Sequence, residues 1–208
     1  MQKTIKHFLA IASSIFVLCF LAIQVLPSPD TAMGDTVTVS AVVSGTYSCS
    51  YSTTTASFGT ITTSAVATAY SSTTIDVTSN TITYVKVYDA GDTSNPGLYY
   101  AGGPDLIGSA DSAYGDTATL VAGTEGYGIQ GAVTAGGSGG DFTIAATYLQ
   151  TSDNVGGLEL AGSEQTLASS DAAVTRKEVV VTYKAAVSSS NLSGTYTDTV
   201  TYTCTTSL

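Results

Sequence analysis

Cysteines, carboxylates and tyrosines are the side chains in this sequence with the greatest capacity for chemistry. Cys49 and Cys204 are the two cysteines that follow an apolar N-terminal segment. An even number of cysteines in an exported chain usually forms disulfides. Closing so long a loop stabilises the fold by about 5 kcal/mol in the chain-entropy treatment. We therefore expect a Cys49–Cys204 bridge; free thiols and a bridge between two subunits are the alternatives.

Carboxylates gather in polar, glycine-containing segments and offer oxygen ligands to a hard cation. Asp89, Asp92 and Asn95 lie together in DAGDTSN, and calcium prefers ligands of this kind. A second set contains Asp105, Asp111 and Asp116. Neither set has the spacing of an EF-hand, and Asx turns use the same residue types. Calcium on Asp89, Asp92 and Asn95 is therefore one of two interpretations, and no other cofactor is expected.

Histidine chemistry is excluded, because the only histidine is His7 in the N-terminal segment. Without a second histidine there is no Ser-His-Asp or Cys-His pair for nucleophilic catalysis. A pair of carboxylates could hydrolyse a glycoside, but tryptophan is absent and the acids lie in loop-like sequence. We expect no catalytic residues and no enzymatic activity.

Tyrosine is the abundant aromatic residue, with 13 copies, all beyond the N-terminal segment. Tyrosine is amphipathic and enriched at interfaces. Two interpretations follow: a face that binds a glycan or a protein, or half-buried rings that cover a sheet. The candidates for the binding face are Tyr84, Tyr88, Tyr99, Tyr100 and Tyr127.

The N-terminal segment has the layout of an export signal. MQKTIKH supplies positive charge, residues 8–26 are mainly apolar, and prolines follow at 27 and 29. The small-x-small sequence at 32–34 predicts cleavage before Asp35, which makes residues 1–34 a signal peptide. The apolar run is close to the ~20 residues that span a bilayer, so an uncleaved anchor is the alternative. We expect a secreted or cell-surface protein that contacts a membrane only through this segment, and only if the segment is not cleaved.

The charge balance excludes one class of partner. Six Lys and Arg against 16 Asp and Glu give a net charge of −10. Phosphate backbones and anionic membrane surfaces are bound by clustered Lys and Arg. We therefore expect no nucleic-acid partner.

Short alternating segments must position these side chains. In TITYVKVY at 81–88, Val85 and Val87 share one face and Tyr84, Lys86 and Tyr88 the other. Strong strands are also predicted at 177–187 and 194–205, whereas 89–117 is predicted to be irregular. In the last strand one face carries Tyr196, Asp198, Val200, Tyr202 and Cys204, and the other carries threonines. No segment after the signal has helical periodicity, so residues 35–208 are expected to form one all-β sandwich domain.

Several motifs resemble the spore-coat-U and pilin-type secreted β-sandwich proteins. They are the early Cys49, SFGTI at 57–61, TTIDVTSN at 73–80 and SGTYTDTV at 193–200. The resemblance implies an immunoglobulin-like sandwich that serves as a surface or filament subunit, in some members completed by a strand from a neighbour. Here the second cysteine lies on the last strand and the middle is longer. The segment 35–43 is therefore either such a donor or the domain's own first strand.

These features predict a secreted structural protein, a cell-surface, coat or pilus-like subunit without catalytic activity. Its expected partners are other copies of itself or other surface proteins. The alternative is a monomeric, adhesin-like binding module for a glycan or a protein.

Overall fold

The computed structural model describes residues 40–52, 55–91, 94–109 and 116–207. The expected signal at 1–34, Asp92 and Asp111 lie outside these residues. The chain divides into two units, 1–42 and 43–208. Of the first unit only residues 40–42 are described, and they are exposed. The described strands, β1 to β15, all belong to the second unit. None of the described segments forms a helix that could span a membrane.

The larger sheet is built around the longest strand of the fold, β13. Valine and tyrosine dominate the middle of β13, and such residues suit a pleated, half-buried surface. All pairs in the sheet are antiparallel. Its path runs β1 (Tyr47–Tyr51), β3 (Thr73–Ser79), β13 (Val174–Ala186), β8 (Gly126–Val133), β11 (Asn154–Gly156) and β7 (Thr117–Thr119), while β2 (Ala67–Thr68) and β9 (Ser138–Gly139) also pair with β13.

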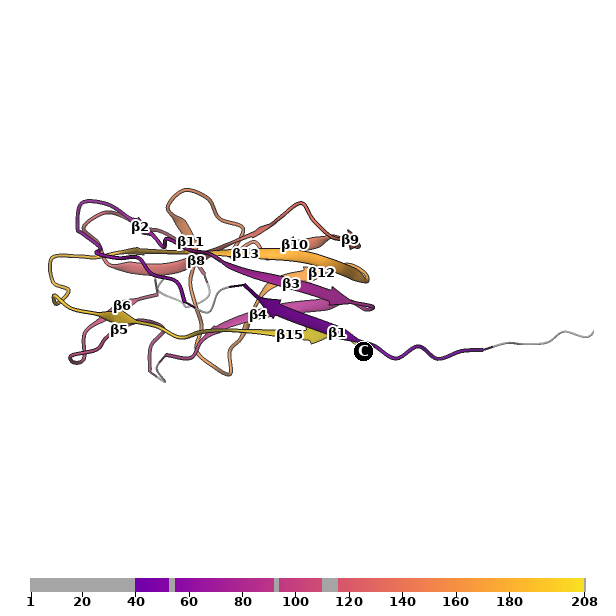
Figure 1. Ribbon diagram of the computed structural model, residues 1–208. Coiled ribbons are helices and arrows are strands. Elements are labelled where there is room, and N and C mark those ends of the chain that lie inside the picture. Colours follow the sequence, from indigo (N-terminus) through magenta and orange to yellow (C-terminus); the bar gives the residue numbers. More distant parts are fainter. Residues whose placement is uncertain (1–39, 53–54, 92–93, 110–115, 208) are drawn as a thin grey trace, which may run out of the picture. The chain divides into compact units, whose positions relative to one another are not determined.

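Two smaller antiparallel sheets complete the fold. The second sheet has the order β10 (Phe142–Ile144), β12 (Gln165–Ser170), β4 (Thr83–Asp89) and β15 (Val200–Thr206). The third has the order β14 (Tyr196–Thr197), β5 (Gly97–Tyr100) and β6 (Leu106–Gly108). Figure 1 shows the larger sheet and the β4–β15 pair as two layers within residues 43–208.

The core lies between these layers. On β4, Val85 and Val87 are fully buried while the residues between them are half-buried, as the alternation predicted. They share one apolar cluster with Ile75 on β3 and Val179 and Val181 on β13. Burial of such aliphatic side chains contributes about 1.5–3 kcal/mol each. The all-β prediction is confirmed: the described residues contain strands, turns and irregular segments but no helix.

Two predictions about where strands lie were wrong. The segment 89–117 was expected to be irregular, but it contains β5 and β6 and ends where β7 begins. The last strand, expected to be continuous over 194–205, is divided into β14 and β15, which belong to different sheets. Asp198 and Thr199 lie at the crossing. Strands of two to four residues carry too short a pattern to be distinguished from turns.

Candidate functional site

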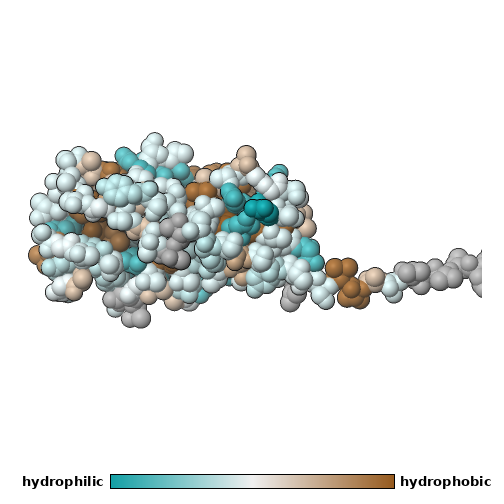
Figure 2. Space-filling model, in the orientation of Figure 1, coloured by the Kyte–Doolittle hydropathy of each residue, from teal (hydrophilic) through white to brown (hydrophobic). Residues whose placement is uncertain are grey.

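A cavity of about 1220 Å³ lies beside the boundary between the sheets. Its walls are the connection after β1, residues 55–63, and the segment 191–202 that contains β14 and the start of β15. Most of these wall residues are serine, threonine and glycine. Figure 2 shows that the visible face of the molecule is largely pale, weakly hydrophilic surface, with apolar residues in recesses between.

A chain of hydroxyl groups crosses between the sheets in the lining of this cavity. Thr73 Oγ1 lies 2.8 Å from the Tyr183 hydroxyl, which lies 2.9 Å from the Tyr202 hydroxyl. The Tyr51 hydroxyl donates to the Tyr202 carbonyl at 3.1 Å. Burial, followed by the nearby Tyr183, raises the pKa of Tyr202 well above its usual value. The Tyr202 hydroxyl is therefore a neutral donor and acceptor at physiological pH.

Two buried carboxyl groups, Asp89 and Asp198, lie close together, and Asp198 is among the residues that line the cavity. Asp89, at the end of β4, is fully buried and accepts hydrogen bonds from Gly91 N at 2.7 Å and Gly97 N at 2.5 Å. A Cβ on Gly91 would lie 2.7 Å from Asp198 Oδ1 and 3.3 Å from Asp89 Oδ1. Oxygen atoms of both carboxyl groups therefore lie close to the same side of Gly91, one from the end of β4 and one from the link between β14 and β15.

Asp198 is the more unusual of the two acids. Both of its carboxyl oxygens are shielded from solvent, and neither meets a donor in hydrogen-bonding geometry among the described residues. Burial, followed by the charge of Asp89, raises the pKa of Asp198 to about 8. Asp198 is thus mainly a neutral carboxylic acid at pH 7, able to donate a proton to a hydrogen bond.

Calcium binding by Asp89, Asp92 and Asn95 stays a prediction, because Asp92 is not among the described residues. Asp89 bonds to the backbone as described above. Asp105, of the second set, accepts from Leu192 N at 2.7 Å and from the Tyr196 hydroxyl. The Tyr196 bond is the main cause of the lowered pKa of Asp105. Within the described part of the chain, no three His, Cys, Asp or Glu side chains gather in metal-binding geometry.

Asp198, which lies close to Asp89, was not predicted as a site residue, although its position in the sequence pattern could have indicated it. Asp198 falls on the same face of its strand as Val200, Tyr202 and Cys204. An acid in a row of core-facing side chains has to be paired, protonated or bound to a ligand. Its partner was not identifiable, because Asp89 is more than a hundred residues away in sequence.

The five candidate tyrosines lie in separate places and do not form one face. Tyr127 is buried in the core and lines the cavity. Tyr84 and Tyr88 lie half-buried on β4, on the face opposite Val85 and Val87. Tyr100 packs against Tyr196, with ring centroids 5.3 Å apart. The tyrosines that line the cavity with Tyr127 are Tyr51, Tyr183, Tyr196 and Tyr202.

The two cysteines join strands at the edges of different sheets. Cys49 lies on β1, the edge strand of the larger sheet, and Cys204 lies on β15, the edge strand of the second sheet. Their sulfur atoms are 2.02 Å apart, and the residues are separated by 155 positions in sequence. The bond therefore joins the two edge strands, at a point where the Cα atoms of the cysteines are 6.6 Å apart.

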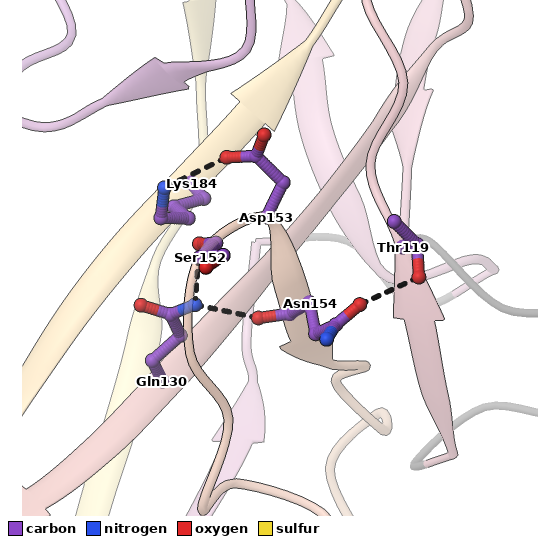
Figure 3. Close-up of polar contacts among 6 residues, drawn as sticks. All are labelled: Thr119, Gln130, Ser152, Asp153, Asn154 and Lys184. Carbon is purple, nitrogen blue, oxygen red and sulfur yellow. Dashed lines mark hydrogen bonds and ion pairs between the residues drawn. The ribbon is translucent and has the colours of Figure 1, made fainter.

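A second polar cluster lies on the larger sheet, and its residues form hydrogen bonds and an ion pair with one another (Figure 3). Lys184 Nζ pairs with Asp153 Oδ1 at 3.1 Å, and Gln130 Nε2 donates to the Ser152 and Asn154 carbonyls at 2.9 and 2.6 Å. Thr119 Oγ1 donates to Asn154 Oδ1 at 2.5 Å. Ser152 has a φ of 55°, a conformation that costs energy in a residue with a side chain. The cluster holds this turn in place.

No family model, curated protein or solved structure that was compared with the chain matches it. The groups that line the cavity are hydroxyls, aromatic rings and one neutral carboxyl group. Hydroxyls can form hydrogen bonds with a ligand, and aromatic rings can pack against it.

Proposed function

We propose that this protein is an extracytoplasmic structural subunit that associates with further copies through the edges of β1 and β15. The observation that carries the proposal is the presence of two long, neighbouring edge strands. Proteins usually protect such edges with short strands, charge or proline. β7 and β10, at the opposite ends of the two sheets, have three residues each, whereas β1 has five and β15 has seven.

The hydrogen-bonding pattern identifies which groups of β15 face outward. Ala90 N donates to Thr199 O and Ser207 N donates to Ile82 O. In an antiparallel pair such bonded positions alternate with non-bonded ones. The N–H and C=O groups of Val200, Tyr202, Cys204 and Thr206 therefore point away from β4.

The backbone groups of β1 alternate in the same way between bonded and outward-facing positions. Asn80 N donates to Thr46 O and Ser52 N donates to Thr74 O, so the backbone groups of Tyr47, Cys49 and Tyr51 point away from β3. No charged side chain occurs on either strand. Both edges thus offer backbone donors and acceptors to an added strand, apart from the Tyr202 carbonyl, which accepts from the Tyr51 hydroxyl.

The residues before β1 strengthen the proposal. TVTVSAVV at 36–43 alternates at first between threonine and valine, a pattern that suits strand addition. Val42 and Val43 are 97% and 82% exposed. Apolar side chains this exposed favour a role in contact with another chain. The signal-like residues 1–34 and the cysteine pair support a location outside the cytosol, where disulfides persist.

Assembly of the secreted full-length product tests the proposal. We expect fibres or sheets by electron microscopy and large species by light scattering. Tyr47→Pro with Thr206→Pro removes one outward donor from each edge, since proline has no N–H. The matched control, Tyr47→Ala with Thr206→Ala, keeps both donors. The proline variant should be monomeric with an unchanged Tm, and the alanine variant should assemble.

Two outcomes contradict the proposal. A wild-type protein that remains monomeric at all concentrations is not a structural subunit of this kind. A folded proline variant that assembles like the wild type shows that association uses another surface.

A further inference from the structure

The cavity beside β15 has a lining whose charge is distinctive. Among the described residues that line it, Asp198 is the only one with an ionisable carboxyl, and no Lys, Arg, His or Glu takes part. An anionic ligand would find no cation here, and a cationic ligand would find an acid that is mainly neutral at pH 7. The charges of the lining therefore favour an uncharged ligand.

The lining combines aromatic rings with many hydroxyl groups. Tyr51, Tyr127, Tyr183 and Tyr202 reach it from β1, β8, β13 and β15, and Thr73 adds a hydroxyl from β3. A hydroxyl can both donate and accept, and a tyrosine ring offers an apolar surface beside its polar tip. A purely apolar ligand would remove the exposed Ser and Thr hydroxyls of the lining from water, which costs free energy.

The entrance to the cavity is polar as well. Thr55, Ser57 and Thr60 on one wall and Ser193 and Thr195 on the other are exposed. The volume of about 1220 Å³ exceeds the usual range for small-molecule sites, roughly 300–1,000 Å³. The cavity can therefore hold a ligand of several rings with hydroxyls on all sides.

We propose that this cavity binds a short neutral carbohydrate. A sugar has apolar ring faces that pack on tyrosine and hydroxyls in every direction that can bond to Thr73, the tyrosines and the Ser/Thr entrance. This binding site goes beyond the proposed structural role, and a subunit that assembles through its edges would carry the sugar site along the assembly.

A peptide strand is the competing occupant, because the open edge of β15 runs along the cavity. The hydroxyl groups of Thr73, Tyr183 and Tyr202 favour the sugar, because they make this part of the lining polar. An added strand with valine side chains would need apolar pockets here instead.

Two-dimensional NMR of the full secreted protein tests this inference. The probes are cellobiose, maltose and chitobiose, with glucuronate and glucosamine as charged counterparts and the peptide TVTVSAVV (residues 36–43) as the competing strand. We expect saturable shifts of the Thr60 and Thr195 amides with at least one neutral disaccharide and none with the charged sugars. The assembly-blocked Tyr47→Pro/Thr206→Pro variant should bind equally, so the two proposals can fail separately.

Tyr202→Phe removes one hydroxyl from the cavity and should weaken sugar binding about tenfold, the effect of one lost hydrogen bond. Tyr84→Phe, on the opposite face of β4, is the matched control and should bind as the wild type. If Tyr202→Phe does not fold, the test depends on the amide shifts of the wild-type protein alone. Absence of saturable shifts with all three disaccharides overturns the inference. Shifts of the same amides with the peptide alone assign the cavity to an added strand.

Discussion

The hydroxyl groups of Tyr183 and Tyr202 form a hydrogen bond of 2.9 Å between the larger and the second sheet. Tyr183 is 7% exposed and also bonds to Thr73 at 2.8 Å. A buried hydroxyl is stabilising only when it has partners. Tyr183 is therefore the central member of a polar connection within a mainly aliphatic core.

Tyr183→Phe should lower the free energy of unfolding by about 1–3 kcal/mol, because it leaves two hydroxyls short of a partner. Tyr84→Phe is the matched control: its ring lies half-buried on the outer face of β4, and its loss of a hydroxyl should change stability little. Urea denaturation of both variants measures the difference. Equal stabilities would show that the hydroxyl chain does not stabilise the fold.

Asp198→Asn should change the dependence of stability on pH. The folded protein holds the Asp198 proton up to about pH 8, whereas an unperturbed carboxyl has a pKa of 3.8. Between these values the unfolded chain binds fewer protons, so the unfolding free energy falls as pH rises, by up to about 1.4 kcal/mol per pH unit. The stabilisation present at pH 4 is lost above pH 8.

Asparagine does not titrate, so the variant lacks this slope, and its stability relative to the wild type should increase between pH 4 and pH 8. Urea denaturation at intervals across this range measures it. Asp105→Asn is the control of opposite sign, because the pKa of Asp105 is lowered. The stabilisation that ionised Asp105 gives the wild-type protein is lost as pH falls below the usual carboxyl pKa range. Parallel pH profiles for wild type and Asp198→Asn would contradict the assignment.

Cys49→Ser with Cys204→Ser should destabilise the protein by about 5 kcal/mol, an upper value for closing a loop with a separation of 155 residues. Thermal denaturation with and without reductant measures the effect: reductant should lower the Tm of the wild type and leave the variant unchanged. Intact mass of the secreted protein reports whether two hydrogens are missing. Thiols that remain reduced in folded, secreted material would exclude the bridge.

Gly97→Ala should be severely destabilising. Gly97 has a φ of +152°, and an added Cβ would lie 2.4 Å from the Ile107 carbonyl oxygen, so the β5–β6 backbone would have to move. Gly108 faces Gly97 in the same pair of strands, and a Cβ there has nothing within 4 Å. Gly108→Ala is therefore expected to fold with nearly wild-type stability. Similar Tm values for the two variants would contradict the close approach of β5 and β6.

Local patterns predicted the strands that are long enough to alternate. Val85 and Val87 point to the core because successive side chains of a strand face opposite sides. Gly97–Tyr100 and Leu106–Gly108 were missed, since three or four residues rich in glycine do not differ from a turn. One of the two interpretations put five tyrosines on a single binding face, but the sheet order separates Tyr84 on β4 from Tyr127 on β8.

The sequence by itself determined the all-β class, the absence of histidine chemistry and the acidic charge, because these depend on composition and short-range alternation. It also showed that Asp198 shares a face with core residues. Only the tertiary structure decided that Asp198 meets Asp89, that Tyr183 meets Tyr202, and that a cavity opens beside them. Each of these contacts depends on how distant strands are ordered in the sheets, and that order results from packing of the whole core.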